Sequence, residues 1–185
     1  MRVACFTPLP PAKSGIADYS AALLPRLAER VELDVFVAAA APGGGELRVR
    51  PAGEFRASEY DVTLYQLGNN PDHSFLYPAA LEHPGVVTLH EYNLHHLIAD
   101  VTIKRGDWGA YLKEAEYNGG AEALAHARRV QALEVGPDYE NLPMNRRLLA
   151  SSRGLIVHSR FMAERARGAG FTGPVGVIPH GAAVG

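Results

Sequence analysis

The chain has 185 residues, of which 47% are hydrophobic and 21% charged, as is ordinary for one globular domain with a sizeable core. Its formal net charge of -2 gives no reason to expect nucleic acid or an anionic membrane as the main partner. The single cysteine, Cys5, excludes an internal disulfide, and its apolar surroundings predict an inert core thiol. No apolar run approaches the roughly 20 residues that span a bilayer, and the N-terminus lacks a signal-peptide pattern. We therefore expect a cytoplasmic protein.

Short apolar runs alternate with amphipathic segments along the chain. The runs predict strands at 3–6, 33–37, 47–49, 61–67, 85–89, 154–157 and 175–178. The amphipathic segments predict helices at 19–30, 75–81, 94–100, 108–133, 145–150 and 161–169. Pro25 should kink or delay the first helix, and Gly119-Gly120 should break the fourth. This alternation is typical of an α/β domain, so we predict a doubly wound, Rossmann-like, mainly parallel sheet.

Polar and small residues follow four of the predicted strands. Because the carboxyl ends of parallel strands meet at one edge of a sheet, we expect these residues to share a polar cleft. They are Ser14, Gly15, Ile16 and Asp18 after the first strand, Gly68, Asn69 and Asn70 after 61–67, His90, Glu91, Tyr92 and Asn93 after 85–89, and His158 and Ser159 after 154–157.

The loop after the first strand has two interpretations. A strand, a rigid loop and a helix start, in that order, can present free backbone N–H groups to a ligand. Equally, Gly15 can serve only to turn the chain while Ser14 or Asp18 caps a helix. A dinucleotide site is excluded, because the G-x-G-x-x-G pattern and the acidic residue after the second strand are both missing. The sequence around Ser159 also lacks the G-x-S-x-G elbow of a hydrolase.

The histidines near residue 90 raise the question of a metal site. A zinc peptidase helix needs H-E-x-x-H, whereas here His90 and Glu91 are followed by His95 and His96. We therefore expect no metal and no cofactor. His95 and His96 are better explained as surface or packing residues of a helix. His90, at a strand end, is suited to a hydrogen bond with a substrate hydroxyl or phosphate.

A mixed basic and aromatic patch lies in the middle of the chain. It comprises Lys104, Arg105, Trp108, Tyr111 and Lys113. Because Asp107, Glu114 and Glu116 dilute its charge, a solvated helix explains it better than a membrane-binding surface. A peripheral contact with a membrane stays open on this patch.

Four segments resemble the N-terminal domain of family 4 retaining glycosyltransferases, the GT-B class also called group 1. They are P-P-A-K-S-G-I-A-D-Y, V-V-T-L-H-E-Y, L-I-V-H-S-R-F-M and V-I-P-H-G, in this order over nearly the whole chain. The resemblance implies that residues 1–174 are the acceptor-binding half of a GT-B architecture. Residues 175–185 would be its last strand and the start of a linker to a donor-binding domain that this chain does not contain.

The resemblance also implies an activity: transfer of a sugar from a nucleotide-sugar donor to a saccharide or lipid-linked acceptor, usually without metal. Ser14, Gly15 and Ile16 would approach the donor phosphate, and His90, as the catalytic candidate, would contact the donor sugar. The implied acceptor contacts are Asp18, Tyr19, Asn69, Asn70, Glu91, Tyr92 and Asn93. The implied cleft residues are His158, Ser159, His180 and Gly181.

In this family the second domain holds most of the donor nucleotide site. We therefore expect the chain to fold alone and to transfer no sugar alone. The alternative is a stand-alone Rossmann-like module that binds a phosphorylated or sugar ligand without chemistry.

Overall fold

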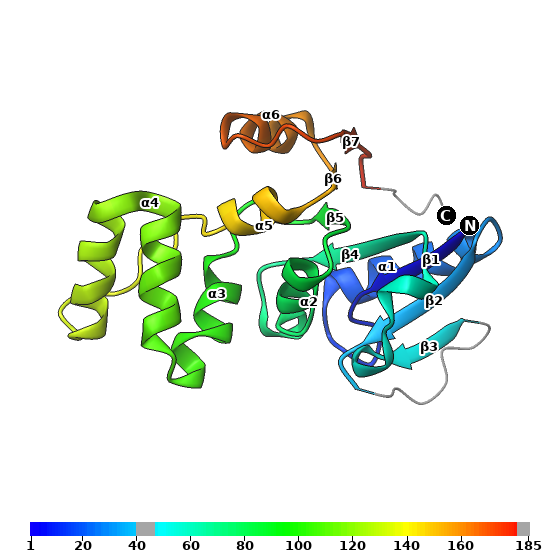
Figure 1. Ribbon diagram of the computed structural model, residues 1–185, viewed down its shortest axis with the longest axis horizontal. Coiled ribbons are helices and arrows are strands. Elements are labelled where there is room, and N and C mark those ends of the chain that lie inside the picture. The colour runs from blue at the N-terminus through cyan, green and yellow to red at the C-terminus, as the bar shows by residue number, and fades with distance from the viewer. Residues whose placement is uncertain (40–46, 181–185) are drawn as a thin grey trace.

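The computed structural model describes residues 1–39 and 47–180, and within them seven strands form one sheet (Figure 1). Every neighbouring pair is parallel, in the order β3-β2-β1-β4-β5-β6-β7. The strands are β1 (Arg2–Phe6), β2 (Glu32–Val37), β3 (Arg48–Pro51), β4 (Val62–Leu67), β5 (Val86–Leu89), β6 (Gly154–Val157) and β7 (Val175–Val177). This is the predicted Rossmann-like α/β fold. The strand order reverses between β1 and β4, where open α/β sheets place their ligands.

Six α-helices connect the strands of the described chain (Figure 1). They are α1 (Gly15–Ala28), α2 (Leu76–Glu82), α3 (His95–Val101), α4 (Trp108–Gln131), α5 (Arg146–Ser151) and α6 (Arg160–Gly168). The break expected in the fourth helix is confirmed, because Gly120 has φ 67° and ψ -155°, which places it outside helical geometry. Among the described residues, none of these helices is long and apolar enough to cross a bilayer.

The first helix begins four residues earlier than the sequence pattern predicts. The Ser14 side chain caps it by accepting a hydrogen bond from the Ile16 N–H (3.3 Å), so the helix starts at Gly15 rather than Tyr19. Pro25 lies inside the last turns and is exposed. Pro25 has no N–H group to donate, but the carbonyl that it leaves without a partner can face water, so the helix continues through this residue. The prediction that Pro25 would delay the start of the helix was wrong, because α1 begins at Gly15. This early start brings the first turn of α1 to the end of β1.

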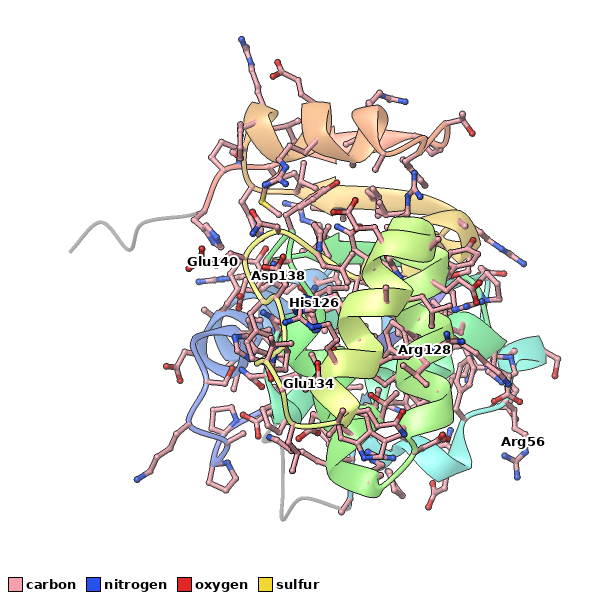
Figure 2. All side chains as sticks on the ribbon, turned by 90° about the vertical axis from the view of Figure 1, so that its left-hand side faces the viewer. Arg56, His126, Arg128, Glu134, Asp138 and Glu140 are labelled. Atoms are coloured by element: carbon pink, nitrogen blue, oxygen red, sulfur yellow. The ribbon has the colours of Figure 1, made fainter. Side chains whose placement is uncertain are left out.

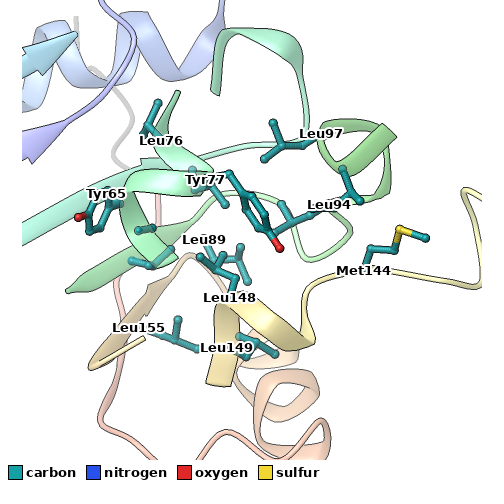
Figure 3. Packing of buried hydrophobic residues seen from close by; sticks show 14 of the residues in the cluster. Tyr65, Leu76, Tyr77, Leu89, Leu94, Leu97, Met144, Leu148, Leu149 and Leu155 are labelled. Carbon is teal, nitrogen blue, oxygen red and sulfur yellow. The ribbon is translucent and has the colours of Figure 1, made fainter. Parts of the chain in front are cut away.

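The two faces of the sheet are covered by different helices. Successive side chains of β1 point to opposite faces, and from Val3 to Phe6 both sets are apolar and need a covering layer. Val3 and Cys5 point to one side and pack with Leu24 of α1. The other side faces a larger cluster, in which α2, α3 and α5 pack over the central strands (Figure 3). Its labelled members are Tyr65, Leu76, Tyr77, Leu89, Leu94, Leu97, Met144, Leu148, Leu149 and Leu155. The helices on both faces pack against the sheet, and the parallel pairing of the strands places their carboxyl ends at one edge.

Candidate functional site

A pocket of about 350 Å³ opens at the carboxyl ends of the central strands. Its lining residues come from four separate parts of the chain: Ser14, Gly15, Ile16, Tyr19, Asn70, His90, Glu91 and His180. A larger hollow of about 520 Å³ lies beside α5 and the segment after α6, away from these strand ends. The smaller pocket therefore gathers the residues that the strand-end argument brings together.

Three histidines form a cluster beside this pocket, which we call the histidine cluster: His90, His158 and His180. His90 and His180 line the pocket, whereas His158 contacts both of them without lining it. His90 Nδ1 lies 3.1 Å from His158 Nε2, and the rings of His158 and His180 stack with centroids 3.7 Å apart. The rings of His90 and His180 are 6.0 Å apart. The cluster arises because β5, β6 and β7 are neighbours, and each is followed by one of these histidines.

Tyr19 packs edge-on against all three rings of the histidine cluster. The distances between ring centroids are 5.0 Å to His90, 5.6 Å to His158 and 5.9 Å to His180. Edge-to-face contacts at such distances are favourable, so the second turn of α1 holds the rings in place. Burial raises the pKa of the Tyr19 hydroxyl, which stays protonated as a hydrogen-bond donor.

Both nitrogens of His90 have polar neighbours inside the protein. Nε2 lies 2.8 Å from Oε1 of the buried Gln66, and Nδ1 faces His158. Burial, followed by the effect of His158, His180 and His73, lowers the pKa of His90 to about 3. Burial also lowers the pKa of His158, although the hydrogen bond to the Ile178 carbonyl acts in the opposite direction and raises it. These two imidazoles are therefore neutral at physiological pH.

The start of α1 forms the wall beside the histidine cluster. Gly15 is exposed and Ile16 is buried, while Ser14 is the N-cap. The first N–H groups of a helix have no partners within it, and the helix dipole favours an anion at this end. The capping interpretation of this loop is confirmed, because Ser14 caps the helix. Binding of a ligand by the N–H groups at this helix start stays a prediction.

Several polar residues expected to contact an acceptor or to line the cleft form hydrogen bonds with the backbone instead. Asn69 Oδ1 accepts from the Leu97 N–H (3.0 Å), and Asn93 donates to the Tyr139 carbonyl (2.6 Å). Ser159 is the N-cap of α6 and accepts from the Met162 N–H (3.2 Å). Asn69 thus connects the end of β4 to α3, Asn93 connects the end of β5 to the segment after α4, and Ser159 connects the end of β6 to α6.

Of the remaining predicted contacts, some line the pocket and others lie outside it. Asn70 and Glu91 line it, although Asn70 also accepts a hydrogen bond from the Asp72 N–H (2.9 Å). Asp18 is exposed in the first turn of α1 and is not part of the lining. The Tyr92 ring lies under the Arg165 guanidinium (4.1 Å), towards α6. Gly181 lies outside the described residues.

His95 and His96 are packing and surface residues, respectively. His95 is fully buried; its Nδ1–H donates to the carbonyls of Asp138 and Leu142, both at 3.0 Å. Its Nε2 accepts from the Tyr111 hydroxyl (2.9 Å). Tyr111 is therefore buried, and it does not belong to the exposed basic and aromatic patch that the sequence suggested. His96 is exposed and stacks on Tyr139 (3.9 Å).

A further histidine, His126, lies on the second half of α4, far along the chain from the pocket. Its Nε2 is 3.0 Å from the carbonyl of Gly136, and Figure 2 shows it beside Asp138. The contact fastens the loop after α4 to that helix, and this histidine takes no part in the site.

Two residues of the site were missed by the sequence argument. Gln66 is a buried polar residue in the mainly apolar strand β4, and its side-chain oxygen lies 2.8 Å from His90 Nε2. His73 is buried beside Gly68, and its Nδ1 donates to the Gln66 carbonyl (3.1 Å). A lone amide in a buried strand was the available signal for Gln66, because buried polar groups require partners.

The fold and the site together define a Rossmann-like α/β domain with a histidine-lined pocket at the switch point of its sheet. In comparisons with known proteins, no family model matches the chain and no curated protein matches its sequence.

Proposed function

We propose that this chain is the acceptor-side domain of a retaining glycosyltransferase. With a second, donor-binding domain facing its pocket, the protein would transfer a sugar from a nucleotide-sugar to an acceptor hydroxyl. One observation carries the proposal: the four segments with the family resemblance, far apart in sequence, meet around one pocket. Three of them contribute Gly15 and Tyr19, His90, and His180 to the pocket lining, and the third in chain order contributes His158, which contacts His90.

Gly15 supports a ligand at this pocket because the fold does not require a glycine there. A Cβ added at Gly15 would have no other part of the structure within 4 Å. Gly15 is also not among the glycines with positive φ, so its backbone suits any residue. Close approach of a ligand to the backbone is a remaining reason for a glycine at the start of α1.

The proposed chemistry uses the electrostatics of the pocket. The N–H groups and the dipole at the start of α1 would stabilise the nucleotide diphosphate as it departs. The bond between the anomeric carbon and the diphosphate oxygen would break, and the acceptor hydroxyl oxygen would bond to that carbon on the face that the diphosphate leaves. The hydroxyl proton would pass to the departing diphosphate, and His90 would contact the donor sugar. No carboxylate nucleophile is needed, and no metal is assigned to the transfer.

Replacing Gly15 by alanine tests the donor contact. In a protein that carries both domains, the change should leave the free energy of unfolding unchanged or slightly higher, because the methyl group meets open space. Transfer should fall by about tenfold or more, with a raised KM for the nucleotide-sugar, because the methyl group displaces the diphosphate. Steady-state kinetics and chemical unfolding measure the two effects.

The matched control is Gly53→Ala, since Gly53 also has open space around its Cβ position and lies in the short 3-10 helix after β3. It should change neither transfer nor KM. Unaltered donor kinetics in the Gly15→Ala protein would contradict a diphosphate at this helix start.

The gene sequence distinguishes the transferase proposal from the alternative function, a stand-alone binding module. We expect the coding sequence to continue beyond codon 185 into a second α/β domain of similar size. Sequencing the transcript would measure this directly. A stop codon at that point would remove the transferase proposal and leave the binding module.

A further inference from the structure

The tautomer of His158 follows from its hydrogen bonds. Its Nδ1 lies 2.8 Å from the carbonyl oxygen of Ile178, which can only accept a hydrogen bond. Nδ1 therefore carries the proton of the neutral ring. The other nitrogen, Nε2, has a free lone pair, and this nitrogen faces His90.

The tautomer of His90 is set in the same way. Its Nε2 lies 2.8 Å from Gln66 Oε1, again an acceptor, so Nε2 carries the proton. The lone pair of His90 is then on Nδ1, which points at His158 Nε2 from 3.1 Å. Two lone pairs facing each other at this distance repel unless a cation lies between them.

We propose that the histidine cluster is a binding site for a divalent late transition metal such as Zn²⁺ or Co²⁺, with His90 Nδ1, His158 Nε2 and His180 as ligands. Two nitrogens on a tetrahedral ion lie roughly 3.3 Å apart, for metal–nitrogen bonds of about 2.0–2.1 Å. The observed 3.1 Å is close to this value. One nitrogen from each of the three rings lies within 4.8 Å of the other two. This spacing is wider than that of a tetrahedral pair, so the exposed His180 ring would turn towards the ion to complete a three-histidine set.

The surroundings of the cluster match those of metal-binding imidazoles. Ligating histidines commonly donate their second N–H to a backbone carbonyl or a side-chain oxygen, which fixes the ring. The Ile178 carbonyl and Gln66 Oε1 have these positions. His180 is exposed and the pocket is open above it, so a fourth position is left for water or a ligand.

This inference departs from the expectation of no metal, which considered His90 with Glu91, His95 and His96. The structure brings in His158 and His180 instead, from segments near the end of the chain. The site does not depend on sugar transfer. If the chain is also a transferase domain, a metal bound here would occupy the Nδ1 side of His90 and would inhibit sugar transfer.

Titration of the chelator-treated chain with Co²⁺ tests the site without any substrate. We expect one equivalent to bind with micromolar affinity and to give the visible absorption of cobalt bound by histidines, with Zn²⁺ displacing it. His158→Ala and His180→Ala should each weaken binding about tenfold or more. His96→Ala, on an exposed histidine outside the cluster, should bind as the parent does.

Two results would overturn the proposal. One is a folded chain that takes up no Co²⁺ at these concentrations, or whose binding is unchanged by His158→Ala. The other comes from nitrogen NMR of the metal-free chain. A proton on His90 Nδ1 would mean that the Gln66 amide is reversed and that His90 simply donates to His158. A proton on His90 Nε2 supports the facing lone pairs.

Discussion

Replacing His90 by alanine in a protein with both domains is expected to lower the transfer rate about a hundredfold or more. His90 lines the pocket between Gly15 and His180, where we propose that the donor sugar lies. The fold should survive, because His90 is half-buried at a strand end and is outside both apolar clusters. Gln66 loses one partner, which should cost about 1–2 kcal/mol of unfolding free energy. Transfer assays and urea unfolding measure the two quantities separately.

His96→Ala is the matched control for this change, since it removes a histidine from the same region. His96 is exposed and contacts Tyr139 rather than the pocket. Transfer by this variant should equal that of the parent. Parent-like transfer by the His90→Ala protein would remove His90 from the mechanism and, with it, the assignment drawn from the family resemblance.

The sheet could be predicted from the sequence because its central strands are largely buried on both faces. Runs such as residues 3–6 are apolar throughout, and each ends at a glycine, proline or polar loop. The start of α1 was harder to predict. The cap at Ser14 and the exposed position of Pro25 decide it, and neither shows in the hydrophobic pattern.

Polar residues at strand ends were predicted to lie together, but the residue types alone did not separate those that hold the backbone from those that line the pocket. Asn93 and Ser159 fix backbone groups, whereas Asn70 and Glu91 line the pocket. An amide or hydroxyl that caps a helix has the same chemistry as one that binds a ligand. Only the geometry after folding separates the two tasks.

The histidine cluster could not be read from the spacing of residues along the chain. His90 and His158 are 68 positions apart and meet because β5 and β6 are neighbours in the sheet. The contact between their rings also depends on Gln66 and the Ile178 carbonyl, which fix each ring from behind. A search for metal patterns within one helix therefore considered a different set of histidines.

The chain is expected to lose stability as the pH falls from about 6.5 to about 4, because two fully buried histidines resist protonation. Burial lowers the pKa of His73 and of His95 from 6.5 to about 4 in each case. The unfolded chain takes up these protons near pH 6.5, so between the two values it binds more protons than the folded chain. The free energy of unfolding then decreases with decreasing pH, by at most roughly 3 kcal/mol for each histidine.

Urea unfolding followed by circular dichroism at several pH values between 7.5 and 4.5 measures this slope. His90 and His158 act in the same direction, so variants are needed to isolate one group. His95→Gln should be less stable at pH 7.5, because it loses contacts to Tyr111 and two carbonyls, but its stability should fall less steeply with acid. His96→Gln, at an exposed position, should change the slope less than His95→Gln does, because burial, and not the effect of His96, is the largest cause of the lowered pKa of His95. An identical slope in the parent and His95→Gln proteins would mean that His95 has the same pKa in the folded and the unfolded chain. That result would contradict the assignment of His95 as a buried neutral imidazole.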